Sequence, residues 1–292
     1  MKVYGIMDGY SGLVKNNLRS LGYDDVSYIL QRGGTILGTS RCDEFFEKKY
    51  RQQGAKNLQS LEIDGLIAIG GDGTFAGARL LSEEFGVNVV GIPGTIDNDI
   101  YGTDYTIGFD TAMNTVIESI DKLRNTASSH HRIFLVEVMG KNSGRIALHA
   151  ALASGAEDVF LPGVSENMEI ITEKLQRAVN AGKSSIIVVA EGDESGGALN
   201  IQNLLRQFEW SAKLRVSVLG HIQRGGAPSY LDRFRATLLG NKAVISLVGA
   251  KSNIMIGFCG EQLVEVELSE TAKSVPALSS DYLNLIQKLS VY

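Results

Sequence analysis

The sequence has few cysteines, no long apolar run and no excess of positive charge. Its two cysteines, Cys42 and Cys259, lie far apart without the spacing of a metal site, so they are expected to be free thiols in a reducing cytoplasm. No apolar run approaches the roughly 18 residues of a membrane span, and no signal peptide is visible. The net charge of −5 gives no electrostatic support for nucleic-acid binding. We therefore expect a cytoplasmic protein without nucleic-acid or membrane partners.

The remaining composition is typical of a large α/β protein. The chain has 292 residues, 44% of them hydrophobic, and is too long for most single cores, so two lobes are expected. Glycine is abundant at 33 residues and proline scarce at 4, which suits many tight connections between strands and helices. Short apolar runs alternate with amphipathic segments such as residues 108–125. This alternation predicts two doubly wound lobes with mainly parallel sheets.

A glycine-rich motif, GGDGT at residues 70–74, follows the apolar run 66–69 and precedes an expected helix. Small residues at a strand-to-helix turn let backbone N–H groups approach a phosphate, and the helix N-terminus adds partial positive charge. Because a bare carboxylate at Asp72 would repel that phosphate, Mg²⁺ between the two is the natural interpretation. The alternative is a tight connection without a ligand, since the motif is short.

A second motif, PGTIDND at residues 93–99, follows the apolar run 87–92. Asp97 and Asp99 lie two residues apart with Thr95 beside them, a set suited to taking a proton from a hydroxyl near a metal-bound phosphate. A polar loop whose aspartate caps the next helix is the structural alternative. Two such motifs at successive strand ends favour the ligand site, because ligands bind at the carboxyl ends of strands in open α/β sheets.

Other polar residues follow expected strands or a glycine-rich loop. Glu191 follows the run SIIVVA, where it would hold sugar hydroxyls or cap the next turn. His221 and Arg224 lie in GHIQRGG after another strand and suit an anionic group. Arg41 follows the loop at 31–40, where it would reach a phosphate or lie as a solvated surface charge.

Taken together, the blocks GGDGT, PGTIDNDI, GTDYTIGFDTA, VEVMG and VLGHIQRGG closely resemble bacterial-type ATP-dependent 6-phosphofructokinases in order and spacing. The resemblance runs from about residue 3 to the C-terminus. It implies phosphoryl transfer from MgATP to the 1-hydroxyl of fructose 6-phosphate, giving fructose 1,6-bisphosphate and ADP in glycolysis. It also implies Mg²⁺ as cofactor, ATP as co-substrate and a homotetramer whose sites are shared between subunits.

The resemblance also divides the chain into two lobes and assigns site residues to them. Residues 1–108 with 222–272 would bind ATP, and residues 109–221 with 273–292 would bind the sugar phosphate. The implied catalytic residues are Thr95, Asp97 as general base, Asp99, Arg41 against charge on the moving phosphoryl group, and Lys141. The implied nucleotide contacts are Tyr10, Arg41, Cys42, Gly71, Asp72, Gly73, Thr74 and Gly77. The implied substrate contacts are Thr95, Ile96, Asp97, Arg132, Met139, Gly140, Lys141, Glu191, Arg215, His221 and Arg224.

Further roles follow from the same resemblance. Asp72 and Asp99 would lie in the Mg²⁺ environment, and Arg132 and Arg215 would reach the 6-phosphate across a subunit boundary. Planar, bidentate guanidinium contacts explain why arginine is used there. Pyrophosphate-dependent relatives tend to carry Asp where this chain has Gly73 and Lys where it has Gly94. Two glycines leave space for the α-phosphate of a nucleotide, so ATP is favoured as donor.

Three features depart from the family's pattern. A first strand, glycine-rich loop and helix of the family have no counterpart here, so either the true start lies upstream or the protein is shortened, in which case the missing strand should expose apolar surface. Lys141 stands where arginine is usual and keeps the charge without the planar fork, so slower chemistry or altered substrate affinity is expected. Arg124 and Glu157 match effector positions, but Tyr23 and Tyr28 stand where charges are common, which argues against effector regulation.

Two other interpretations compete with an active kinase of this family. GGDGT also occurs in NAD kinases and lipid kinases, although these lack the TIDND and HIQRGG blocks. The departures also suit a truncated, weakly active or non-catalytic paralogue that acts as a subunit or regulatory partner.

Overall fold

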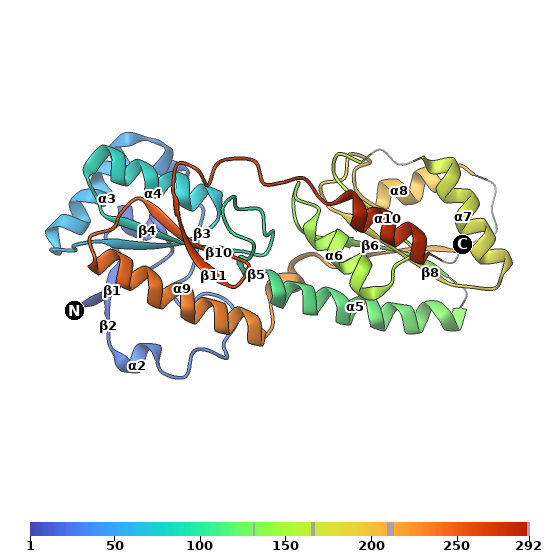
Figure 1. Ribbon diagram of the computed structural model, residues 1–292, viewed down its shortest axis with the longest axis horizontal. Coiled ribbons are helices and arrows are strands. Elements are labelled where there is room, and N and C mark those ends of the chain that lie inside the picture. The colour runs from blue at the N-terminus through green and yellow to red at the C-terminus, as the bar shows by residue number, and fades with distance from the viewer. Residues whose placement is uncertain (131, 165–166, 209–212, 291–292) are drawn as a thin grey trace. The chain divides into compact units, whose positions relative to one another are not determined.

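The computed structural model describes residues 1–130, 132–164, 167–208 and 213–290. The chain forms two compact units (Figure 1). Unit 1 comprises Met1–Thr95, Ile100–Gly108 and Ala227–Val275, and unit 2 comprises Ile96–Asp99, Phe109–Gly226 and Pro276–Tyr292. The lobes expected from the sequence had boundaries at 108, 221 and 272, whereas the boundaries between the two units fall after residues 95, 99, 108, 226 and 275. Within the described residues, no helix is both long and apolar enough to cross a membrane.

Unit 1 is built on a mainly parallel sheet. Its strand order is β11 (Gln262–Glu267), β10 (Ile254–Cys259), β4 (Val89–Thr95) and β3 (Leu66–Gly70), with β5 (Ile107–Gly108) also paired to β4. Strand β4 runs parallel to β3, β5 and β10. Strand β11 forms a hairpin with β10 and runs antiparallel to it. The helices of this sheet are α4 (Asp72–Phe85) and α9 (Tyr230–Val248).

These two helices cover opposite faces of the sheet (Figure 1). Val89 of β4 packs in one cluster with Phe75 of α4, whereas the next residue, Val90, packs in another with Leu239 of α9. Successive side chains of a strand point to opposite faces, so a continuous apolar run such as β4 needs a helix on each side. The sheet is therefore buried on both faces, as a doubly wound lobe requires.

The first sixty residues of unit 1 form a second, small sheet with short helices that pack against α4. They contain β1 (Val3–Ile6), α1 (Tyr10–Val14), β2 (Leu18–Leu21), α2 (Tyr23–Val26), the 3₁₀ helix η1 (Asp43–Phe46) and α3 (Lys48–Ser60). Strands β1 and β2 pair only with each other among the described strands. At the edge of the main sheet, Ile69 of β3 is 62% exposed.

Unit 2 contains a wholly parallel sheet of strand order β7 (Asp158–Phe160), β8 (Ser185–Ala190), β6 (Ile133–Val138) and β9 (Leu214–Val218). Its helices are α5 (Phe109–His130), α6 (Arg145–Ser154), α7 (Met168–Asn180), α8 (Gly197–Leu205) and α10 (Ser280–Leu289), with the 3₁₀ helix η2 (Gly220–Arg224). The predicted fold class, two α/β lobes with mainly parallel sheets, is confirmed.

The faces of this sheet are again distinguished by alternate residues. Val136 of β6 packs with Ile120 of α5, and its neighbour Leu135 packs with Ile171 of α7 and Ile201 of α8. Because β6, β8 and β9 are parallel and in register, their carboxyl ends meet at one edge. The loops that follow these three strands therefore lie side by side.

Arg51 of α3 joins η1 to α4 in unit 1. Its Nε and Nη2 donate to the two carboxylate oxygens of Glu84, both at 2.8 Å. Its Nη1 donates to the carbonyl oxygens of Phe45 and Phe46 at 2.9 and 2.8 Å. The Arg51 side chain is only 6% exposed, so these hydrogen bonds and the ion pair join η1 to α4 where water has little access.

We expect Arg51→Met to lower the free energy of unfolding by about 3 kcal/mol, because it leaves a shielded carboxylate and two carbonyl groups without their donor. Arg79 and Glu83 form the matched control, an exposed ion pair on α4. Arg79→Met should cost less than about 0.5 kcal/mol. Urea unfolding of both variants measures the difference, and equal losses would contradict the structural role of Arg51.

Candidate active-site loops

The glycine-rich turn of unit 1 links β3 to the start of α4. Helix α4 begins at Asp72, and the N–H of Phe75 donates to the carbonyl oxygen of Gly71 at 3.1 Å. A Cβ added to Gly73 would meet no atom within 4 Å, so open space lies beside this first helical turn. The amides of a helix N-terminus and its dipole favour an anion at such a place. This geometry is compatible with a phosphate-binding turn, and the binding itself stays a prediction.

The side chain of Tyr10 contacts this turn. Its hydroxyl donates to the carbonyl oxygen of Thr74, and its ring stacks on Phe45 with the centroids 4.0 Å apart. Burial raises the pKa of the Tyr10 hydroxyl, which keeps it a neutral donor. A Cβ on Gly77 would lie 2.7 Å from the Tyr10 ring, so this glycine permits their close approach.

The other residues predicted to contact the nucleotide lie in the same unit. Arg41 is exposed just before η1, and Cys42 packs against the cluster around Leu13 and Phe45. Gly71 has room for a Cβ, since its nearest neighbour would be Thr95 Cβ at 3.8 Å. All eight residues predicted to contact the nucleotide therefore belong to unit 1, and their roles as contacts stay predictions.

Strand β4 ends beside this turn, and Thr95 is its last residue. A Cβ on Gly94 would lie 3.3 Å from Ile69 Cγ2, a tight contact with the neighbouring strand. Thr106, only 3% exposed, donates its hydroxyl to the carbonyl oxygen of Thr95 at 2.6 Å and so fixes the end of β4. This role could not be predicted from the sequence, because a threonine in a loop has no distinguishing pattern.

The next residues along the chain, Ile96–Asp99, belong to unit 2. Asp97 is 3% exposed, and its Oδ2 lies 2.7 Å from Lys141 Nζ. Ser143 donates its hydroxyl to the carbonyl oxygen of Asp97 at 2.9 Å. Asn98 has a φ of +49°, a left-handed conformation that turns the backbone between the two aspartates. Ile96 packs against the core of this unit.

The carboxyl group of Asp99 lies in an unfavourable environment for its charge. Burial raises its pKa most, and the neighbouring charge of Asp97 raises it further. Lys141 and Arg145 oppose these effects and lower the pKa of Asp99. Two carboxylates and a lysine therefore act as one electrostatic group, which is the kind of arrangement that functional sites use.

The loops after β6 and β8 are tied together at the same edge of the sheet. The backbone N–H of Lys141 donates to Glu191 Oε1 at 2.9 Å. Lys141 has a φ of +45°, which is rare for a residue with a side chain. A Cβ on Gly192 would lie 2.2 Å from the carbonyl oxygen of Lys141, so only glycine allows the two loops to approach so closely.

The loop after β9 joins this group through a residue whose role the sequence analysis missed. Gln223 accepts a hydrogen bond from the backbone N–H of Met139 at 3.1 Å. His221 and Arg224 are exposed on either side of it. The structure thus brings the loops carrying Met139, Gly140, Lys141, Glu191, His221 and Arg224 to one edge of the sheet, next to Asp97.

Arg132 and Arg215 are not brought to this edge. Arg132 immediately precedes β6, and Arg215 is paired with Phe134 at the start of the same strand. A strand of the length of β6 spans roughly 20 Å at about 3.3 Å per residue. The two arginines therefore lie near the amino ends of the strands, about a strand length from the loops of their own chain.

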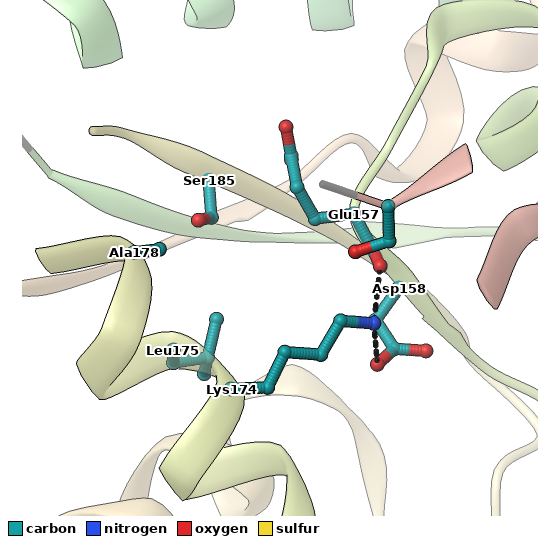
Figure 2. A pocket seen from close by; sticks show the side chains of 7 residues that line it. Glu157, Asp158, Lys174, Leu175, Ala178 and Ser185 are labelled. Atoms are coloured by element: carbon teal, nitrogen blue, oxygen red, sulfur yellow. Dashed lines mark hydrogen bonds and ion pairs between the residues drawn. The ribbon is translucent and has the colours of Figure 1, made fainter. Parts of the chain in front are cut away.

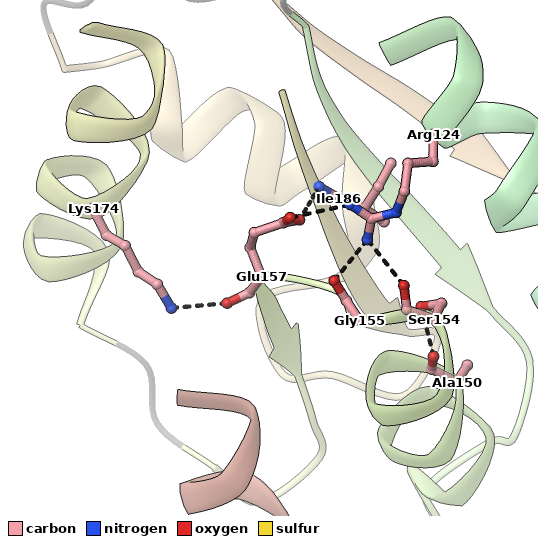
Figure 3. A network of polar contacts seen from close by, with 7 residues as sticks. All are labelled: Arg124, Ala150, Ser154, Gly155, Glu157, Lys174 and Ile186. Carbon is pink, nitrogen blue, oxygen red and sulfur yellow. Dashed lines mark hydrogen bonds and ion pairs between the residues drawn. The ribbon is translucent and has the colours of Figure 1, made fainter. Parts of the chain in front are cut away.

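The residues at the predicted effector positions are engaged with each other (Figure 3). Arg124 Nη1 lies 3.1 Å from Glu157 Oε1, and its Nη2 donates to the carbonyl oxygens of Ser154 and Gly155 at 3.1 and 2.7 Å. Glu157 Oε2 accepts a hydrogen bond from the N–H of Ile186 at 2.6 Å. This pair already has a structural function, the joining of α5, α6 and β8, and its role in effector binding stays a prediction.

A small pocket next to this network lies at the start of β7 and β8 (Figure 2). Lys174 extends along it to donate to the carbonyl oxygen of Glu157 at 2.8 Å and to Asp158 Oδ2 at 3.0 Å. The pocket is therefore at the opposite edge of the sheet from the loops described above. None of the catalytic, nucleotide or substrate residues predicted from the sequence lines it.

Metal binding by the protein alone has little support in the described part of the chain. No group of three or more His, Cys, Asp or Glu side chains within it could hold a metal ion. A divalent cation at the aspartates would therefore need ligands from a substrate as well. Mg²⁺ commonly binds in this way, through one or two carboxylates and substrate phosphates.

Comparison with known proteins assigns the chain to a family. The family model described as Phosphofructokinase matches residues 1–247. The chain belongs to the phosphofructokinase family. It is 47% identical to the ATP-dependent 6-phosphofructokinase 1 of Thermus thermophilus and 45% identical to the ATP-dependent 6-phosphofructokinase of Macrococcus caseolyticus. Both matches cover 100% of this chain and 90% of the relative.

Solved structures confirm the family's fold for this chain. A phosphofructokinase structure from Saccharomyces cerevisiae matches with a TM-score of 0.84 and 32% identity, covering 92% of this chain and 41% of that chain. The pyrophosphate-dependent phosphofructokinase from Marinobacter aquaeolei matches with a TM-score of 0.83 but only 22% identity, covering 98% of this chain and 82% of that chain. The second likeness supports the fold alone.

The environment of Asp99 predicts that this residue reduces stability. Because its pKa is raised in the folded state, ionisation at neutral pH disfavours folding, and the penalty disappears below the ordinary carboxyl range. Asp99→Asn should therefore raise the melting temperature by about 2 °C at pH 7. The gain should shrink as the pH falls and vanish below about pH 3, where the Asp99 carboxyl group is neutral in both the folded and the unfolded state.

Asp158→Asn is the matched control for this measurement. It removes the ion pair between Asp158 and Lys174, whose atoms lie 3.0 Å apart, and should lower the melting temperature at pH 7. An Asp99→Asn variant that is less stable than the wild type at pH 7 would contradict the electrostatic description of this loop.

Proposed function

We propose that the chain catalyses phosphoryl transfer from MgATP to the 1-hydroxyl of fructose 6-phosphate, giving fructose 1,6-bisphosphate and ADP. Sequence identity to ATP-dependent 6-phosphofructokinases over the whole chain carries this proposal. The shielded Asp97 with Lys141 at 2.7 Å supports it, because such a carboxylate suits the activation of a hydroxyl. The reaction is a step of glycolysis, and the chain acts in the cytoplasm.

Asp97 is the general base that takes the proton of the 1-hydroxyl. Lys141 orients its carboxylate and offers positive charge to the transferring phosphoryl group. Ser143 holds the backbone of the same residue, so the base is fixed from two sides. Positioning and charge stabilisation account for most of the rate enhancement in phosphoryl transfer. Thr95 and Arg41 complete the catalytic set.

The nucleotide phosphates bind at the turn around Asp72 and Gly73, where α4 begins. Asp72 and Asp99 are the carboxylates that would hold Mg²⁺, which would offset phosphate charge when MgATP is bound. Open space at Gly73 supports ATP as donor, because an aspartate there would project toward the α-phosphate.

Met139, Glu191, His221 and Arg224 hold the sugar phosphate at the loop edge of unit 2. Arg132 and Arg215 lie about a strand length from that edge, so within their own chain they are far from these loops. They bind the 6-phosphate of a neighbouring subunit in a homotetramer. Their position at the amino ends of the strands, away from the loops of their own chain, supports this assignment.

The test of the proposed base is Asp97→Asn, which should lower kcat by about 10³-fold, within the range for general bases. Asp158→Asn, a shielded aspartate of the same unit at the opposite sheet edge, should leave kcat unchanged. A coupled assay of ADP formation measures both. An Asp97→Asn variant with nearly full activity would exclude Asp97 as the base.

Shared sites predict complementation between two inactive variants. Asp97→Asn and Arg215→Ala should each be nearly inactive as homomers. After unfolding and refolding together, mixed oligomers should regain about a quarter of the wild-type activity, because some sites combine an intact Asp97 with an intact Arg215 of a neighbour. Refolding each variant alone is the control. Without any gain on mixing, the assignment of Arg215 to a neighbouring subunit fails.

A further inference from the structure

We propose that Gln223 is the positioning residue that sets the sugar-phosphate loops against each other. The inference rests on the proposed function and assigns a role to a residue that does not itself contact the substrate. Gln223 lies in η2, between His221 and Arg224, and is only 1% exposed.

The hydrogen bonds of Gln223 use both ends of its side-chain amide. Its Oε1 accepts from the backbone N–H of Met139 at 3.1 Å, and its Nε2 donates to the carbonyl oxygen of Gly220 at 3.0 Å. The first bond joins η2 to the loop after β6, and the second closes η2 on itself. Only an amide of this length offers an acceptor and a donor together, so neither Leu nor Glu reproduces both bonds.

The geometry of η2 separates the buried from the exposed side chains. With about three residues per turn, His221 and Arg224 fall on the same side of a 3₁₀ helix, and Gln223 points elsewhere. His221 and Arg224 are indeed exposed while Gln223 is buried. Anchoring Gln223 therefore fixes the direction in which the other two side chains point.

The anchor also connects these side chains to the proposed base. The loop that carries Met139 continues to Lys141, whose N–H bonds Glu191 and whose Nζ lies 2.7 Å from Asp97. Gln223 is thus the link between η2 and the loop that holds the base. Losing this link should misplace His221 and Arg224 while leaving the nucleotide residues of unit 1 in place.

The expected effect is consequently confined to one substrate. Gln223→Met should raise the KM for fructose 6-phosphate about tenfold, with a smaller change in kcat and an unchanged KM for ATP. Gln223→Glu keeps the length and the acceptor but places an oxygen against the Gly220 carbonyl group, so it should show the same split. This second variant decides the matter if Gln223→Met does not fold.

Gln202→Met is the matched control. Gln202 is 9% exposed in α8, and its Nε2 donates to the carbonyl oxygen of Leu214 at 3.2 Å, at the start of β9. This variant should lose stability in thermal unfolding without changing either KM. The comparison separates positioning from the general cost of removing a buried glutamine.

Each outcome of the kinetic comparison is decisive. An active wild type with an unchanged KM for fructose 6-phosphate in the Gln223 variants would overturn this inference alone. Equal increases in both KM values, or failure of both variants to fold, would make Gln223 a structural residue and overturn it too. A wild-type chain that forms no ADP would overturn the proposed function first and this inference with it.

Discussion

The parallel register of β6, β8 and β9 is the constraint on which the proposed sugar-phosphate site depends. Val138 lies opposite Ala190, and Glu137 lies opposite Val218, so three loops emerge together at one edge. Side chain–backbone hydrogen bonds then join these loops to each other, from Glu191 and from Gln223. Burial of both sheet faces makes the register strongly specified, because a slip of one residue would exchange the faces. The same register places Arg215 at the other edge of the sheet. It therefore lies about a strand length from Lys141 and Arg224 of the same chain.

The electrostatic centre of this edge is the Asp97–Lys141 pair with Asp99 beside it. Two residues of this region have a left-handed backbone conformation: Asn98, which follows Asp97 in the chain, and Lys141 itself. Such conformations persist only where surrounding contacts determine them, and here Ser143 and Glu191 supply those contacts. Lys141 meets one carboxylate oxygen of Asp97 at 2.7 Å with a single donor group. Slower chemistry or altered substrate affinity, expected because lysine lacks the planar fork of arginine, stays a prediction. The burial and the neighbouring carboxylate that raise the pKa of Asp99 also make the loop suitable for a cationic ligand.

Much of this organisation could be predicted from sequence. The apolar run SIIVVA forms strand β8, and the amphipathic segment 108–125 lies almost wholly in helix α5, because continuous apolar and amphipathic patterns leave little choice of element. Short elements such as α1 and β2 were not predicted, since tertiary contacts such as the packing of Leu13 determine them. The motifs identified the strand-end loops, but not Gln223 or Ser143, whose partners are backbone groups distant in sequence. Hydrogen bonds to a distant backbone leave no pattern in the sequence of either partner.

The most direct test of the central claim is product analysis with the purified wild-type chain, fructose 6-phosphate, Mg²⁺ and either ATP or pyrophosphate. The account predicts fructose 1,6-bisphosphate and ADP in equal amounts with ATP, and no bisphosphate with pyrophosphate. Bisphosphate formed only from pyrophosphate would contradict the role given to the open space at Gly73. Absence of bisphosphate with both donors would contradict the catalytic role itself and favour a non-catalytic member of the family.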